Sequence, residues 1–168
     1  MAMYACVDVA YHESSARAAC VTFEQWDDAN ASGEFILDLP DAQPYVPGQF
    51  FQRELPCILS ILQQLPAKPE ILLVDGYVWL DERRRKGLGA HLFEALGESL
   101  AIIGVAKTRF ATATSAFEVF RGKSQRPLFV SAAGIDQDIA ADSIRHMHGE
   151  NRIPTLLKRV DTLSRIPD

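Results

Sequence analysis

The segment Tyr4-Ala-Cys-Val-Asp-Val-Ala10 is apolar on both sides of a single acid, Asp8. Small, β-branched and aromatic residues in such a short run are typical of a strand inside a sheet. A charge on a buried strand costs several kcal/mol unless another group compensates it. We therefore expect residues 3–11 to form a central strand, and we expect a partner for the charge of Asp8.

The pattern outside this segment predicts an α/β protein. Residues 17–25 and 33–39 read as two more strands, and the short turns between them favour antiparallel pairing. Further apolar strands and helices alternate along the chain, with strands at 70–75, 101–106 and 127–133 and helices near 48–65, 87–99, 136–147 and 154–164. Pro56 predicts a break and a new start within the first helix. The order indicates a mixed sheet with helices on its faces.

Length and composition are those of an ordinary globular chain. At 168 residues, with 48% hydrophobic and 23% charged residues, we expect a single domain over 1–168. No apolar run approaches the roughly 20 residues needed to cross a bilayer, and the N-terminus does not look like a signal peptide. We therefore expect a cytoplasmic protein. Three widely spaced cysteines predict neither a disulfide framework nor a zinc site.

Charge is distributed unevenly along the chain, although the net value is −5. Through Glu82 there are 13 acidic and 3 basic residues, whereas from Arg83 onward there are 9 acidic and 14 basic residues. The basic residues cluster at 83–86, 107–109, 121–126 and 158–159. Such clusters either form a solvated surface or contact phosphate, and local clusters matter more than the total charge.

Three carboxylates occupy places where a metal site would form. Asp8 lies on the first strand, Glu54 follows the third strand, and Asp75 ends the strand Ile71-Leu-Leu-Val74. Ligand sites in such sheets gather at the carboxyl ends of strands. Three oxygen ligands there would suit Mg²⁺ or Mn²⁺ and would serve phosphodiester chemistry. Taken singly, each acid could instead cap a turn or form an ion pair.

Five short motifs occur in a shared order. They are Val7-Asp-Val-Ala-Tyr11, Pro44-Tyr-Val-Pro-Gly48 with Arg53-Glu-Leu55, Leu73-Val-Asp-Gly76, Gly87-Leu-Gly-Ala-His-Leu92 and Ile103-Gly-Val-Ala-Lys107. In order and approximate interval the chain resembles the endonuclease V family over residues 4–110. The resemblance implies a ribonuclease H-like mixed sheet, with three antiparallel strands followed by parallel strands and helices on both faces. It also implies Mg²⁺- or Mn²⁺-dependent nicking of DNA or RNA near a deaminated base, typically inosine.

The resemblance assigns roles to individual residues. It matches Asp8, Glu54 and Asp75 to metal-binding carboxylates and Lys107 to a lysine near the scissile phosphate. It matches Pro44, Tyr45, Val46, Pro47 and Gly48 to a wedge beside the target base, where a Tyr between two rigid prolines could replace a stacked base. We also expect Arg83, Arg84 and His91 to contact nucleic acid, and we expect the protein to be a monomer.

Two departures from the family pattern leave questions open. The loop Asp75-Gly-Tyr-Val-Trp-Leu-Asp-Glu-Arg-Arg-Arg-Lys86 is one residue longer than the family's and lacks its His-Pro-Arg, so the base recognised stays open. Family members often carry a histidine near the last helix, where Asn151 stands here. Asp136, Asp142 and His148 are other candidates for that fourth place at the metal.

Two other classes of function compete with the nuclease. Arg84-Arg-Lys-Gly-Leu-Gly89 fits the motif with which GCN5-related acetyltransferases cradle the pyrophosphate of coenzyme A at a helix start. Alternatively, residues 83–86 with Tyr45 or Trp79 could form a catalytically silent nucleic-acid-binding module. The three carboxylates argue against the silent module, because acids facing phosphate weaken binding.

Overall fold

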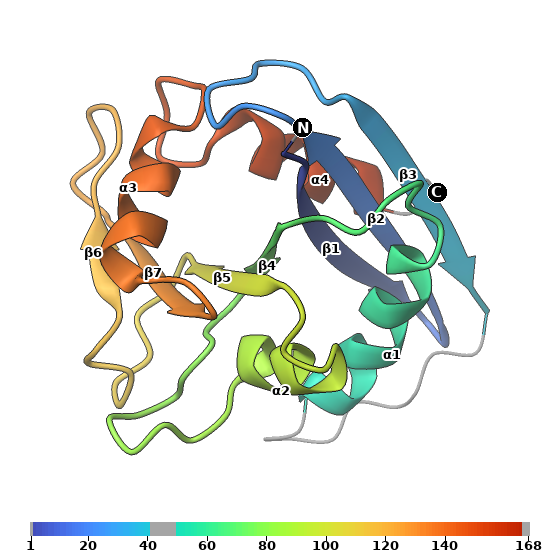
Figure 1. Cartoon of the computed structure of the whole chain (residues 1–168), viewed down its shortest axis with the longest axis horizontal. Coiled ribbons are helices and arrows are strands. Elements are labelled where there is room, and N and C mark those ends of the chain that lie inside the picture. The colour runs from blue at the N-terminus through green and yellow to red at the C-terminus, as the bar shows by residue number, and fades with distance from the viewer. Residues whose placement is uncertain (1, 41–49, 166–168) are drawn as a thin grey trace.

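The computed structural model describes residues 2–40 and 50–165, which build one seven-stranded sheet in the order β3-β2-β1-β4-β5-β7-β6 (Figure 1). The strands are β1 (Tyr4–His12), β2 (Ser15–Phe23), β3 (Gly33–Leu39), β4 (Ile71–Asp75), β5 (Ala101–Ala106), β6 (Phe117–Val119) and β7 (Leu128–Ala133). The sequence predicted six of them within two residues at either end. It missed β6, which is too short to show a period.

Strand directions match the prediction on one side of the sheet and differ on the other. β1, β2 and β3 pair antiparallel, and β4 and β5 continue parallel to β1. β7 runs antiparallel to β5, which the expected run of parallel strands did not include. The unpredicted strand β6 explains the difference, because it runs in the same direction as β5 and ends near the carboxyl end of β5, so β7 starts there and runs the opposite way.

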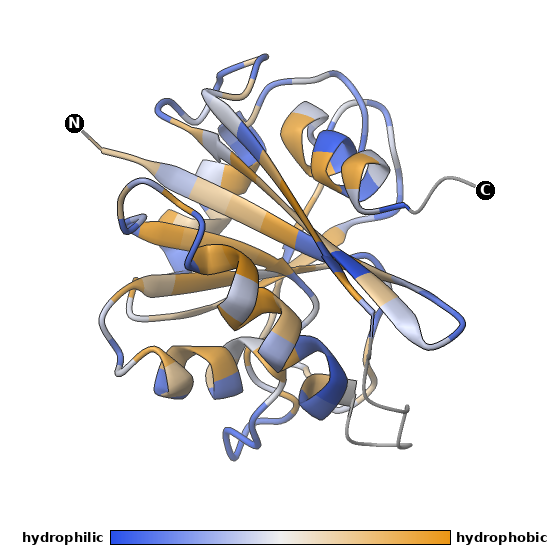
Figure 2. Cartoon of the chain, turned by 90° about the vertical axis from the view of Figure 1, so that its right-hand side faces the viewer, coloured by the Kyte–Doolittle hydropathy of each residue, from blue (hydrophilic) through white to orange (hydrophobic). Residues whose placement is uncertain are grey.

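Helices cover both faces of the sheet, as predicted (Figure 1). α1 (Phe50–Leu62) and α2 (Leu88–Ala95) lie on one face, and α3 (Gln137–His146) and α4 (Thr155–Ser164) lie on the other. Successive residues of β4 alternate between these two layers: Leu72 packs with the first pair and Leu73 with the second. Burial on both faces explains why β4 is continuously apolar, and Figure 2 shows the apolar colour concentrated between the layers.

The predicted helix break at Pro56 is wrong. α1 runs without interruption from Phe50 to Leu62, with Pro56 inside it. Proline removes one backbone hydrogen bond and crowds the carbonyl four residues earlier, which ordinarily bends or ends a helix. Pro56 itself is exposed, whereas Ile58 and Ile61 of the same helix are buried against the sheet. Packing of that apolar face therefore outweighs the local cost of the proline.

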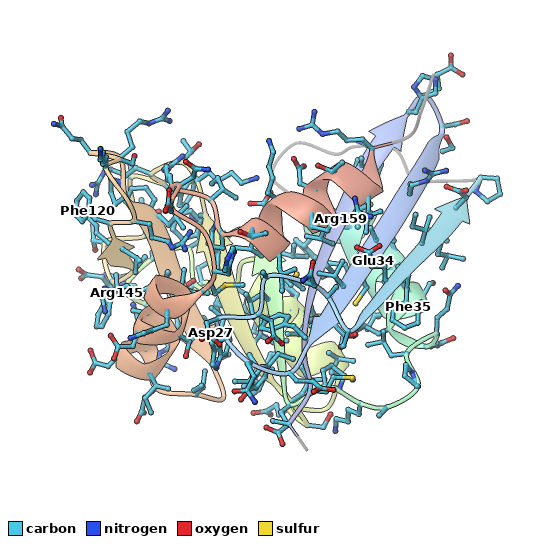
Figure 3. All side chains as sticks on the ribbon, turned by 90° about the horizontal axis from the view of Figure 1, so that it is seen from above. Asp27, Glu34, Phe35, Phe120, Arg145 and Arg159 are labelled. Atoms are coloured by element: carbon cyan, nitrogen blue, oxygen red, sulfur yellow. The ribbon has the colours of Figure 1, made fainter. Side chains whose placement is uncertain are left out.

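α4 is fixed across the first three strands. It packs on β1 and β2, and Arg159 on α4 forms a two-pronged ion pair with Glu34 on β3, with the shorter contact at 2.6 Å (Figure 3). The buried thiol of Cys6 on β1 donates a weak hydrogen bond to the Leu156 carbonyl. All three cysteines are buried and free, so the expectation of no disulfide framework is confirmed. Among the helices that the structure describes, none is long and apolar enough to span a membrane.

Arg121 is the one buried arginine among the described residues, with 5% of its surface exposed. Its Nη1 donates to the carbonyl oxygens of Asn151 and Arg152, and its Nη2 donates to those of Met147 and Gly149. The chain after β6 is thereby attached to the segment between α3 and α4. Arg121 therefore stabilises the fold, because without it four carbonyl oxygens would lose a hydrogen-bond donor.

We predict that Arg121→Met lowers the free energy of unfolding by about 3 kcal/mol, because four carbonyls lose a charged donor. Urea denaturation measures the change. The matched control is Arg145→Met on α3, where an exposed arginine pairs with Asp142 and the expected loss is below about 1 kcal/mol. Equal losses in the two variants would show that Arg121 does not anchor this part of the fold.

Candidate active site

Two of the predicted carboxylates meet because their strands are parallel neighbours. Cys6 on β1 pairs with Leu73 on β4. Asp8 and Asp75 each follow two residues later, so the register places both acids at the carboxyl-terminal side of the same strand pair. Lys107 directly follows β5, the next parallel strand, and its Nζ lies 3.8 Å from Asp75 Oδ2. This edge of the sheet is where the sequence placed the site.

A fourth charged group reaches this edge from the C-terminal part of the chain. Asp161 on α4 lines the same small cleft as Asp8, Asp75 and Lys107. The apolar walls come from β1, β4, β5, β7 and the region of α4. The cleft holds about 20 Å³, which is room for one water molecule or one ion. A substrate would therefore have to lie across its mouth.

Glu54 on α1 completes the acidic group without lining the cleft. Burial first, and then the charges of Asp8 and Asp75, raise its pKa to about 8 against the opposing charge of Arg53. The pKa of Asp8 is raised to about 7, chiefly by burial and then by Asp75. Partial burial also raises the pKa of Asp75, against the opposing charge of Lys107. These mutual effects show that the three predicted acids lie close enough to repel one another.

Hydrogen bonds hold two of the acids in place. The fully buried hydroxyl of Ser164 donates to Asp8 Oδ2 at 3.1 Å and to the Asp161 carbonyl at 2.8 Å. Arg165 donates to Asp161 Oδ2 at 2.9 Å. Burial acts to raise the pKa of Asp161, but hydrogen bonds from Arg165 and from the protonated form of Asp8 outweigh it and lower that pKa. Asp161 is therefore the acid of this group that stays charged most readily.

The donor set suits a hard divalent cation, because it consists of carboxylate oxygens. Within residues 2–40 and 50–165, however, no three acidic, histidine or cysteine side chains come close enough to hold one ion. The carboxylates repel one another when no cation neutralises them. This repulsion accounts for side chains that lie near each other without closing around one point. Two buried polar atoms beside Glu54, Tyr11 Oη and Arg53 Nε, also lack a hydrogen-bond partner among these residues. The grouped carboxylates call for added positive charge, whereas Arg53 Nε calls for an acceptor.

The structure does not bring every predicted contact residue to this cleft. Arg84 stacks over Trp79 at 5.1 Å and lines cavities beside Ala132, at the carboxyl end of β7 and so at the opposite edge of the sheet. Arg83 is exposed in the same turn. His91 stacks on Phe51 with ring centroids 3.8 Å apart, so it packs α2 against α1. The predicted wedge, Pro44, Tyr45, Val46, Pro47 and Gly48, lies outside the described residues.

None of the four candidates for the fourth acidic position lies at the cleft. Asp136 lines a cavity near Arg84, Asp142 pairs with Arg145, and His148 contacts the Thr155 hydroxyl. Asn151 is exposed, and its carbonyl accepts from Arg121. The acid that does line the cleft with Asp8 and Asp75 is Asp161. Helical periodicity could have found it, because Leu157, Val160, Asp161 and Ser164 share one face, and an acid on an apolar face calls for a partner.

The backbone at the start of α2 excludes the acetyltransferase reading of residues 84–89. Gly87 N–H donates to the Val78 carbonyl at 2.8 Å, and Gly89 N–H donates to the Tyr77 carbonyl at 3.2 Å. These amides are already bonded and cannot cradle a pyrophosphate. A Cβ on Gly87 would lie 2.4 Å from the Tyr77 oxygen. The glycines therefore serve close packing of α2 against the segment after β4.

Comparison with known proteins agrees with this geometry. The family model for endonuclease V matches residues 1–125. Endonuclease V of Streptomyces avermitilis is 33% identical over 186 residues, covering 95% of this chain and 77% of the relative. Endonuclease V of Azotobacter vinelandii is 38% identical over 112 residues, covering 64% of this chain and 48% of the relative. The chain thus spans about half the length of the second of these relatives.

Solved structures share the fold. The Streptomyces avermitilis enzyme superposes with a TM-score of 0.76 at 29% identity, covering 96% of this chain and 79% of the other. Endonuclease V of Ciona intestinalis superposes with a TM-score of 0.80 at 20% identity, covering 96% and 83%. The mixed sheet of this order, with acids at one edge, is a ribonuclease H-like fold. The chain belongs to the endonuclease V family, whose members are metal-dependent hydrolases.

The raised pKa values predict how the metal-free protein responds to pH. Asp8 and Glu54 have folded-state pKa values of about 7 and about 8, above their ordinary values of 3.8 and 4.5. The folded state therefore binds more protons than the unfolded state in this range, and the free energy of unfolding falls as pH rises from about 4 to about 8. Urea denaturation in EDTA, repeated across that range, measures the fall.

Asp8→Asn should reduce the decrease in the free energy of unfolding between pH 4 and pH 8, because the substitution removes one carboxyl group that titrates and repels the other acids. At pH 8 we expect the variant to be about 1–2 kcal/mol more stable than the unsubstituted protein, and at pH 4 nearly equal to it. Asp142→Asn on α3 serves as the control and should change neither value. A variant less stable than the unsubstituted protein at pH 8 would contradict the repulsion between these acids.

Proposed function

We propose that this protein is a metal-dependent endonuclease that hydrolyses a phosphodiester near a deaminated base, inosine, in DNA or RNA. The observation that carries the proposal is the convergence of Asp8, Asp75 and Asp161 on one cleft beside Lys107. The family assignment supports it. The Ciona intestinalis relative was crystallised with DNA containing an inosine followed by a ribo-adenosine, which makes such a strand the first substrate to test.

Asp8, Glu54, Asp75 and Asp161 would hold Mg²⁺ or Mn²⁺, because their grouped oxygens lack sufficient positive charge. Such an ion polarises a phosphodiester and lowers the pKa of bound water. The carboxylates orient water and substrate at the mouth of the cleft. Ser164 keeps Asp8 in one orientation through the hydrogen bond to Oδ2. The Asp8 carboxylate is then fixed before substrate arrives, which lowers the cost of assembling the site.

Lys107 would stabilise charge on the scissile phosphate. Its side chain is 42% exposed, and its Nζ lies 3.8 Å from Asp75 Oδ2, beyond the length of a strong hydrogen bond. A lysine held loosely by an acid can turn to a phosphate that enters beside it. We propose that Pro44–Gly48 acts as the wedge beside the target base.

We predict that Asp8→Asn and Asp75→Asn each lower the nicking rate by at least about 100-fold, because each removes a ligand of the ion. The assay follows cleavage of inosine-containing single- and double-stranded DNA and RNA with Mg²⁺, with Mn²⁺ or with EDTA. Asp142→Asn is the control and should retain full activity. Nicking that persists in EDTA, or in either site variant, would refute the proposal.

Metal binding has a second readout that is independent of activity. Mn²⁺ should raise the melting temperature of the protein, since a ligand at 100 times its dissociation constant adds about 2.7 kcal/mol of stability. Asp161→Asn should reduce this increase, whereas Asp136→Asn, at the opposite edge of the sheet, should leave it unchanged. An equal increase in both variants would remove Asp161 from the metal site.

A further inference from the structure

The basic cluster at residues 121–126 has no role in the chemistry above, yet it lies at the same edge of the sheet. β7 begins at Leu128 and pairs antiparallel with β5, so its amino end adjoins the carboxyl end of β5. Lys107 follows that end. The segment 120–127 therefore reaches the sheet beside the acidic cleft. Figure 3 shows Phe120, in this segment, on the left and Arg159 of α4 to its right.

A second arginine fastens this segment to the active site. Arg152 Nε donates to the Arg126 carbonyl at 3.0 Å, and its Nη2 donates to the Pro127 carbonyl at 2.8 Å. The same Nη2 also donates to the Lys107 carbonyl. One guanidinium therefore joins the end of the segment 120–127 to the residue that we place at the scissile phosphate. The separation between them is fixed by backbone contacts.

The other end of the segment is fixed as firmly. Arg121 binds four carbonyls of residues 147–152. Gly122 has φ +58°, and a Cβ there would lie 2.0 Å from the Glu150 carbonyl oxygen, so only glycine permits this approach. Both arginines use backbone carbonyls as partners. Their positive charges are therefore not cancelled by acids.

Two exposed side chains of this segment are cationic and unneutralised. Lys123 and Arg126 are both exposed, and neither forms an ion pair with any residue that the structure describes. Two other surface arginines near this part of the fold differ: Arg109 pairs with Glu118, and Arg159 pairs with Glu34. Two free cations on a rigid base, adjoining a phosphodiesterase site, form a surface suited to successive phosphates.

We propose that the segment 120–127 is a phosphate-binding platform that holds the substrate strand beyond the scissile bond. Lys123 and Arg126 contact backbone phosphates, and Arg152 sets the spacing between this platform and Lys107. The inference rests on the proposed nuclease function and specifies which surface positions the strand. It assigns no base recognition to the platform, because its contacts are to phosphate.

Salt dependence of binding tests the platform. Affinity of a fluorescein-labelled single-stranded DNA with one inosine is measured by fluorescence anisotropy in EDTA, so that no cleavage occurs, over a series of salt concentrations. Each lost phosphate contact lowers the slope of log K against log salt by about 0.7 on a single strand. Lys123→Ala/Arg126→Ala should lower the slope by about 1.4 and the affinity at low salt by about 10-fold.

The control is Lys68→Ala, which removes an exposed lysine with no ion pair among the described residues at the amino-terminal side of β4. It should leave slope and affinity unchanged. Urea denaturation confirms that the double variant is folded, since neither substituted side chain makes a described contact. A double variant with the unsubstituted slope would overturn the platform, as would equal effects of Lys68→Ala.

The outcomes separate the platform from the nuclease proposal. Metal-dependent nicking with an unchanged slope would leave the nuclease standing and remove the platform. A lowered slope without nicking under any metal condition would keep the platform as a phosphate-binding surface and remove the nuclease. Failure of the unsubstituted protein to bind the oligonucleotide at all would overturn both.

Discussion

Repulsion between acids at one edge of the sheet is the constraint on which the rest of this structure depends. Asp8 and Asp75 arrive there because β1 and β4 are parallel neighbours, and the register leaves neither acid another place. Asp161 arrives because α4 packs over β1 and β2. Each contact that holds these elements also holds like charges together, so the fold is least stable where its chemistry would occur. A bound cation would neutralise the acids, and the same arrangement would then stabilise the fold instead of destabilising it.

Sequence reasoning predicted the parts of this arrangement that follow from local pattern. Apolar runs around Asp8 and before Asp75 mark strands, and strands of one sheet bring their ends to one edge. The roles of those acids came from a family resemblance, since the spacing alone left ordinary turns and ion pairs open. Asp161 was missed because it lies on an amphipathic helix near the C-terminal end of the sequence. An acid next to Val160 there looks like an ordinary residue at the border between the apolar and polar faces of the helix. Helical periodicity places Asp161 on the apolar face of α4, but the acid that it meets there, Asp8, lies more than 150 residues away, and no local pattern identifies that partner.

Other differences between prediction and structure have equally specific physical causes. Pro56 predicted a helix break because propensity is a local quantity, but Ile58 and Ile61 bury on the sheet and the helix continues. Arg84 was predicted to contact nucleic acid because it is basic and precedes a glycine-rich helix start, and the sequence alone did not show that it lies away from the acidic cleft. The chain after Asp75 instead crosses over Gly104, where a Cβ would lie 2.5 Å from the Gly76 carbonyl, and this path carries Arg84 to the far edge. The sequence does not show in which direction the loop after Asp75 runs, and this direction decides where Arg84 lies.

The two guanidinium groups near the cleft show why rigid support and substrate binding can coexist. Arginines paired with acids would anchor loops equally well, but each pair would lose its positive charge toward a polyanion. Arg121 and Arg152 anchor through carbonyl oxygens, which carry only partial charge, so this end of the sheet keeps its cations while remaining ordered. Asp8, Asp75 and Asp161 line the cleft with Lys107, and the cations of the segment 120–127 adjoin it. A strand that approaches this edge meets attraction first and meets the repelling acids only where a bound ion would neutralise them.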